Sequence, residues 1–218
     1  MAMTDLPDFY LIRHGETEWN REGRYQGQRD IPLNETGRGQ ADANGRLLRQ
    51  LFERDGIDPL AWHWRASPMI RTRETMTRVR AAFGLGDDGV MFDARLREVS
   101  FGVYEGTLAA ELPDDPNGMR NVGARDETFW FFRPEGGESY DDLVNRVRPV
   151  LAELPGPSVI VAHGGIARIC RHLVEGRSRR DTVNWPIRQD ALMFFSKGVM
   201  KVYSSAEPGA PVKDSGKL

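Results

Sequence analysis

Two histidines in this sequence stand where a short apolar run ends, and each is followed by glycine. His14 follows residues 9–12 and Arg13, and His163 directly follows residues 159–162. A strand that is covered on both faces has no room for such groups in its middle, but its carboxyl end can carry them, because ligands of open α/β sheets bind there. A lone histidine is more often structural, so it is the repetition of the pattern that makes both candidates for one shared site.

Cationic side chains accompany both histidines. Arg13 is adjacent to His14, and Arg71 lies one helical turn after Ser67-Pro68, which predicts a helix start. Guanidinium groups are planar, bidentate donors to a phosphoryl group, and the backbone N–H groups after Gly164 would add positive potential at a helix start. A neutral, oriented imidazole is a competent nucleophile. The combination indicates phosphoryl transfer.

A metal site is the rival interpretation of two histidines. No cysteine or acidic cluster accompanies them, and the two arginines would repel a divalent cation. We therefore expect neither a metal nor another cofactor.

The chain alternates between apolar runs of strand length and segments with helical spacing. Strands are predicted at 9–12, 62–66, 159–162, 191–196 and 200–204. Helices are predicted at about 35–54, after Ser67 as far as Gly84, from 139 to about 153, and at about 165–175. This alternation predicts an α/β fold with helices on both faces of a mostly parallel sheet.

One segment does not fit the alternation. Residues 107–134 are polar and loop-like and end in the aromatic run 129–132, so we interpret them as a lid inserted into a single domain spanning 1–204. The aromatic run could shape a substrate pocket, although packing in the core or lid is the commoner use. Residues 205–218 are predicted to be a mobile tail.

The bulk composition narrows the possible partners. The 218 residues carry a formal net charge of −2, which gives no reason to expect binding to nucleic acid or membrane. The lone cysteine, Cys170, allows no intrachain disulfide, and no signal peptide or run of ~20 apolar residues is present. We expect a cytoplasmic protein whose partner is a small molecule.

The motifs resemble the signature of the histidine phosphatase superfamily, which includes the cofactor-dependent phosphoglycerate mutases. The resemblance extends from about residue 8 to residue 170. The motifs that carry it are RHGET at 13–17, GRYQG at 23–27, DIPLN at 30–34, SPMIR at 67–71, LRE at 96–98, FG at 101–102, EG at 105–106, GGES at 136–139 and HGG at 163–165. It implies a three-layer α/β/α sandwich with a mostly parallel, mixed sheet.

The resemblance also implies roles for individual residues. His14 matches the nucleophile that becomes phosphohistidine, and Arg13 and Arg71 match the arginines that hold the phosphoryl oxygens. His163 matches the second histidine of the phosphate pocket, expected here as a cation, and Glu98 matches the acid that protonates the leaving group. Further substrate contacts are implied for Asn20, Gln26, Gly27 and Gly164.

Three functions fit these residues. We favour hydrolysis of a phosphomonoester, because only about thirty residues separate Gly106 from Gly136 and because VSFG, rather than the RHYG run of mutase members, follows Glu98. A phosphoglycerate mutase is the alternative, and a non-catalytic binding protein of the same fold is a third. The natural substrate is not readable from the sequence, and the family resemblance leaves a homodimer open.

Overall fold

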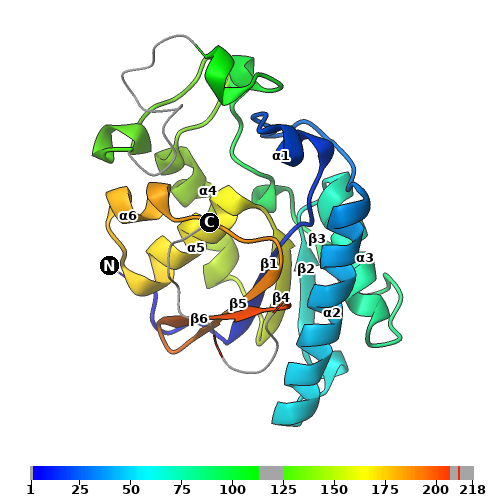
Figure 1. Cartoon of the computed structure of the whole chain (residues 1–218). Coiled ribbons are helices and arrows are strands. Elements are labelled where there is room, and N and C mark those ends of the chain that lie inside the picture. The colour runs from blue at the N-terminus through cyan, green and yellow to red at the C-terminus, as the bar shows by residue number, and fades with distance from the viewer. Residues whose placement is uncertain (1, 113–124, 207–210, 212–218) are drawn as a thin grey trace.

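A six-stranded sheet forms the centre of the part of the chain that the computed structural model describes, residues 2–112, 125–206 and 211 (Figure 1). The strands lie in the order β3-β2-β4-β1-β5-β6. Neighbours from β3 to β1 are parallel, whereas β5 is antiparallel to both β1 and β6. The sheet is therefore mixed but mostly parallel, as expected. The strands are β1 (Phe9–Arg13), β2 (His63–Ala66), β3 (Val90–Phe92), β4 (Ser158–Ala162), β5 (Ala191–Ser196) and β6 (Val199–Ser204).

Helices cover both faces of the sheet, and the alternation of side chains along β1 explains how (Figure 1). Tyr10 and Ile12 pack into a cluster with α2 (Glu35–Asp55) and α3 (Ile70–Ala81). Phe9 and Leu11 point the other way, toward α4 (Tyr140–Ala152) and α5 (Gly164–Glu175). The result is the three-layer α/β/α sandwich. Cys170 is buried in the cluster between the sheet and the helices α4 and α5.

Short elements complete the described chain. They are α1 (Glu18–Glu22), α6 (Arg179–Asn184) and the 3-10 helices η1 (Pro59–Ala61), η2 (Ala94–Leu96), η3 (Gly102–Tyr104), η4 (Ala109–Glu111) and η5 (Glu127–Trp130). The sequence did not predict α1, α6 or β3. These elements are three to six residues long, too short to show a hydrophobic period.

The start of α3 corrects one prediction. Ser67 does not cap this helix, which begins at Ile70 after Met69, a cap residue without a side-chain hydrogen bond. The Ser67 hydroxyl instead lies 2.8 Å from Nε2 of His163. A serine before proline was interpreted as a local signal, but here it makes a tertiary contact.

The aromatic run at the end of the predicted lid is largely core. Phe129 and Trp130 are buried in the cluster that α4 and α5 build, while Phe131 is exposed. Residues 113–124 of this segment lie outside the described residues, as does the tail except for Ser205, Ala206 and Pro211. No helix among the described residues is long and apolar enough to cross a membrane.

Candidate active site

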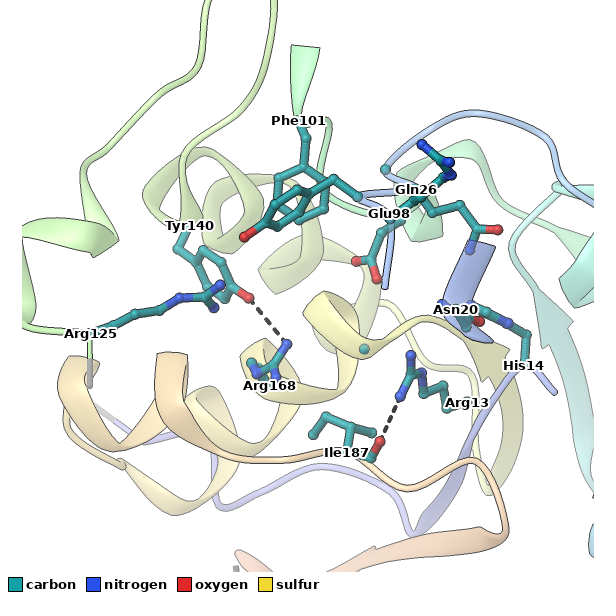
Figure 2. Close-up of a pocket in the computed structure, with 14 residues that line it drawn as sticks. Arg13, His14, Asn20, Gln26, Glu98, Phe101, Arg125, Tyr140, Arg168 and Ile187 are labelled. Atoms are coloured by element: carbon teal, nitrogen blue, oxygen red, sulfur yellow. Dashed lines mark hydrogen bonds between the residues drawn. The ribbon is translucent and has the colours of Figure 1, made fainter. Parts of the chain in front are cut away.

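A pocket of about 180 Å³ opens at the carboxyl ends of β1 and β4 (Figure 2). The register of the two parallel strands pairs Arg13 with Ala162, so β1 and β4 end side by side at the same edge of the sheet. The backbone N–H of His14 donates to the Ala162 carbonyl at 3.0 Å, which extends the ladder by one residue. The pocket is lined by Arg13, His14, Asn20, Arg24, Tyr25, Gln26, Gly27, Glu98, Phe101, Arg125, Tyr140, Gly164, Arg168 and Ile187.

Gly15 explains how the chain turns away from the sheet immediately after His14. A Cβ at Gly15 would lie 2.1 Å from the carbonyl oxygen of Gly37 on α2. Only glycine permits this close approach of two backbones. The contact fixes the loop against α2 and holds His14 at the pocket wall.

One hydrogen bond sets the tautomer of His14. Its Nδ1 lies 2.7 Å from the Gly15 carbonyl oxygen, which can only accept, so Nδ1 carries the proton. Nε2 then keeps its lone pair, and no group among the described residues bonds to it. Burial, followed by the charges of Arg71 and Arg13, lowers the pKa of His14 well below 6.5. The imidazole is therefore neutral at physiological pH, as a nucleophile must be.

His163 lies beside His14, with ring centroids 5.2 Å apart in an edge-to-face arrangement. It is the N-cap residue of α5, and its Nε2 lies 2.8 Å from Ser67 Oγ. Burial and then the charge of Arg71 lower its pKa well below 6.5. In the ligand-free site the ring is therefore neutral, because a buried imidazole beside two guanidinium groups is more stable when uncharged. The cationic form expected beside a phosphoryl group stays a prediction.

Arg13 and Arg71 supply the fixed positive charge. Arg71 donates to the carbonyl oxygens of Arg29 and Gly27 at 2.7 and 2.8 Å, and Arg13 donates to that of Ile187 at 2.6 Å. The Nε of each arginine is buried and has no hydrogen-bond partner among the described residues. Burial lowers the pKa of each arginine to about 10, so both remain cationic at neutral pH.

Glu98 faces the pocket from the loop after η2, and backbone groups of α5 hold its carboxylate. Its two oxygens accept the Gly165 N–H at 3.0 and 3.1 Å, and Oε1 also accepts the Val99 N–H at 3.0 Å. A Cβ on Gly165 would lie 2.4 Å from Glu98 Oε1, so this approach needs glycine at position 165. The HGG motif therefore positions the carboxylate as well as the helix.

The other predicted contacts fall into two groups. Asn20, Gln26, Gly27 and Gly164 line the pocket, together with Arg13, His14 and Glu98. Arg71 and His163 are completely buried and lie behind the lining, where their charge or ring acts on His14. The aromatic run 129–132 contributes no lining residue.

Seven lining residues had no role assigned from the sequence: Arg24, Tyr25, Phe101, Arg125, Tyr140, Arg168 and Ile187. Arg168 could have been found, because it lies one helical turn after Gly164 and therefore on the same face of α5. Tyr140 follows the GGES motif directly, where the Ser139 capping box starts α4. Arg125 carries no sequence signal, since tertiary contacts with α6 place it.

The described residues contain no group of three or more histidine, cysteine or acidic side chains that could hold a metal ion. Within the described part of the chain, the pocket lining holds four arginines and one acidic residue, Glu98. Such a lining suits an anionic ligand.

Comparison with known proteins gives the family. Residues 9–195 match the model of the histidine phosphatase superfamily (branch 1). A probable phosphoglycerate mutase, GpmB, of Salmonella paratyphi B is 39% identical over 163 residues, which are 71% of this chain and 68% of that protein.

Solved structures of similar proteins belong to the same kind of enzyme. A mycobacterial glucosyl-3-phosphoglycerate phosphatase in complex with VO3 superposes with a TM-score of 0.72 at 29% identity, covering 87% of this chain and 92% of the other. A phosphoglycerate mutase from Thermus thermophilus gives a TM-score of 0.63 at 28% identity, with 86% and 91% covered. The chain belongs to branch 1 of the histidine phosphatase superfamily and is an enzyme of the phosphatase or mutase type.

Proposed function

We propose that this protein hydrolyses phosphomonoesters of small metabolites without a metal, through a phosphohistidine on His14. The observation that carries the proposal is the hydrogen bond from Nδ1 of His14 to the Gly15 carbonyl. It leaves a neutral Nε2 as the free nucleophile beside two permanently charged arginines.

The chemistry has two steps. Nε2 of His14 attacks phosphorus and the bond to the ester oxygen breaks, while Glu98 gives that oxygen a proton. Water then attacks the phosphohistidine, Glu98 takes up its proton, and the nitrogen–phosphorus bond breaks to release phosphate. Arg13 and Arg71 stabilise the charge on the equatorial oxygens, which is the largest demand in phosphoryl transfer.

A phosphoglycerate mutase remains the second candidate, because a 39% identical relative is named as a probable one. A mutase returns the phosphoryl group to an acceptor before water reaches it, which requires a closed site. The short segment after Gly106 supports hydrolysis. A binding-only function is disfavoured, since nucleophile, cations and acid are all brought together.

Replacement of His14 by Asn tests the mechanism. The variant should lose at least about 10³-fold of its turnover of p-nitrophenyl phosphate and should form no acid-labile phosphoenzyme after rapid quenching, because the nucleophile is absent. His63→Asn is the matched control, since it removes an exposed imidazole at the opposite end of the sheet. Substantial turnover by His14→Asn would show that another group attacks phosphorus.

A further inference from the structure

The pocket holds more positive charge than the proposed mechanism uses. Arg13 lies in its wall and Arg71 behind it, and both serve the phosphoryl group. Three further arginines line the pocket. Arg24 donates to the Glu22 carboxylate, whereas Arg125 and Arg168 line the end of the pocket away from His14 (Figure 2). Among the residues that the structure describes, Glu98 is the one acidic side chain of the lining.

These two arginines are held in place by the fold. Arg125 is 4% exposed, and its guanidinium lies 4.1 Å from the centroid of the Phe129 ring and donates to the Val183 carbonyl at 3.3 Å. Its backbone N–H donates to Asn184 Oδ1 at 3.0 Å, and its carbonyl accepts from Asn184 Nδ2 at 2.7 Å. A cation buried this deeply at a pocket wall is stabilised further when an anion enters the pocket.

Arg168 links this group to the phosphoryl site. Its Nε donates to the Trp185 carbonyl at 2.9 Å, and its Nη1 donates to the Tyr140 hydroxyl at 3.4 Å. Since the Tyr140 oxygen accepts this bond, its own proton is left to be donated to a ligand. Phe129 and Trp130 pack against the Tyr140 ring and fix its direction.

Distances around Gly164 show how close the two regions are. A Cβ at Gly164 would lie 3.7 Å from Arg13 Nε, 3.8 Å from Arg168 Nη1 and 3.8 Å from Glu98 Oε2. The two guanidinium groups are thus near enough for one small molecule to contact both. The pKa of Arg13 is lowered chiefly by burial, and the charge of Arg168 contributes to this shift, which is consistent with the proximity.

We infer that Arg125, Arg168 and Tyr140 form a second anion subsite, which binds a carboxylate or a second phosphate group on the same substrate. The inference rests on the proposed function for the position of the first phosphoryl group. It narrows the substrate to phosphomonoesters that carry another anionic group a few atoms from the ester. Phosphate esters of uncharged alcohols would offer no second anion to the three donors at this end of the pocket.

Phosphonates test the subsite without hydrolysis. Calorimetry would compare propylphosphonate, 3-phosphonopropionate and propane-1,3-bisphosphonate, which carry no second anion, a carboxylate and a second phosphonate. The wild-type protein should bind at least one of the last two about tenfold or more tightly than propylphosphonate, as expected for charge-assisted hydrogen bonds. The better of the two identifies the anion.

Variants locate the effect. In Arg168→Met the affinity ratio between the doubly anionic ligand and propylphosphonate should fall toward one, and in Tyr140→Phe it should fall several-fold. Arg46→Met, which removes an exposed arginine on α2, should keep the wild-type ratio. Equal binding of all three phosphonates, or an unchanged ratio in Arg168→Met, would overturn the inference. Turnover of p-nitrophenyl phosphate by the wild type tests the proposed function separately, because that substrate has no second anion.

Discussion

His14 and His163 face each other edge to face at a centroid distance of 5.2 Å, although they leave different strands. The parallel pairing of β1 with β4 produces this contact, because it brings both strand ends to one level. Burial and the nearby arginines lower the pKa of both rings well below 6.5. The ligand-free site therefore holds two neutral imidazoles beside permanent cations.

This relationship predicts that acid destabilises the protein. Each ring stays neutral when folded but takes up a proton near pH 6.5 when unfolded, so the unfolded state binds more protons as the pH falls below that value. The free energy of unfolding should drop by about 1 kcal/mol for each of the two histidines between pH 6.5 and pH 5.5. Urea unfolding at a series of pH values measures this loss.

Histidine variants assign the loss. His14→Asn and His163→Asn should each remove about 1 kcal/mol of the pH-dependent term. A wild-type profile in His14→Asn would mean that this ring is protonated in the folded protein as well.

The sequence predicted the elements whose signals are local and repeated. The strands ending at Arg13 and Ala162 are continuous apolar runs, and the helix after Asn34 has a cap and an apolar stripe. The bounds of all three elements were predicted within a residue or two. Their ends carry His14 and His163, and the sheet rules then brought these residues together. The position of both histidines in one site could therefore be predicted from the sequence.

The rest depends on contacts between distant segments. Ser67 has the sequence context of a helix cap but contacts His163, and Arg125 enters the pocket only because Asn184 and Val183 hold it. The neutral form of His163 in the ligand-free site also could not be read from the sequence, since burial is a property of the fold. Residue type and spacing do not report any of these relationships.

The loss of activity on replacing Glu98 should be larger for substrates whose leaving group requires protonation. Glu98→Gln should reduce kcat/KM for an alkyl phosphate by about 10²- to 10⁴-fold, but for p-nitrophenyl phosphate by less than about tenfold, because p-nitrophenolate leaves without protonation. Steady-state assays on both substrates give the comparison. Equal losses would assign Glu98 a structural role.

Gly165→Ala should reproduce that pattern without touching the carboxylate chemically. The new Cβ would lie 2.4 Å from Glu98 Oε1 and must displace it. The alkyl phosphate should again lose more activity than p-nitrophenyl phosphate. Gly39→Ala is the control, since nothing lies within 4 Å of a Cβ at that position on α2. A selective loss in Gly39→Ala as well would point to a general effect of glycine replacement.

Chelation should leave the activity unchanged. In the proposed mechanism Arg13 and Arg71 supply the charge that a metal supplies in other phosphatases, and both remain cationic at neutral pH. Hydrolysis of p-nitrophenyl phosphate would be measured after dialysis against EDTA, with and without added magnesium. Activity that disappears on dialysis and returns with magnesium would contradict the arginine-based mechanism.

Hydrolysis should outpace isomerisation when the two reactions are measured side by side. A mutase must keep its phosphohistidine from water, so its site has to close over the substrate. In this chain only about thirty residues separate Gly106 from Gly136, and the part of that segment that carries Phe129 and Trp130 packs into the core rather than along the pocket.

The assay would follow 3-phosphoglycerate isomerisation, primed with 2,3-bisphosphoglycerate, together with phosphate release from 3-phosphoglycerate and from glycerol 3-phosphate. We expect phosphate release to be the faster reaction, because the short segment after Gly106 favours access of water to the phosphohistidine. 3-Phosphoglycerate should be the better of the two substrates if Arg168 binds its carboxylate, so the same experiment also examines the second subsite. Rapid isomerisation with negligible phosphate release would make the enzyme a mutase.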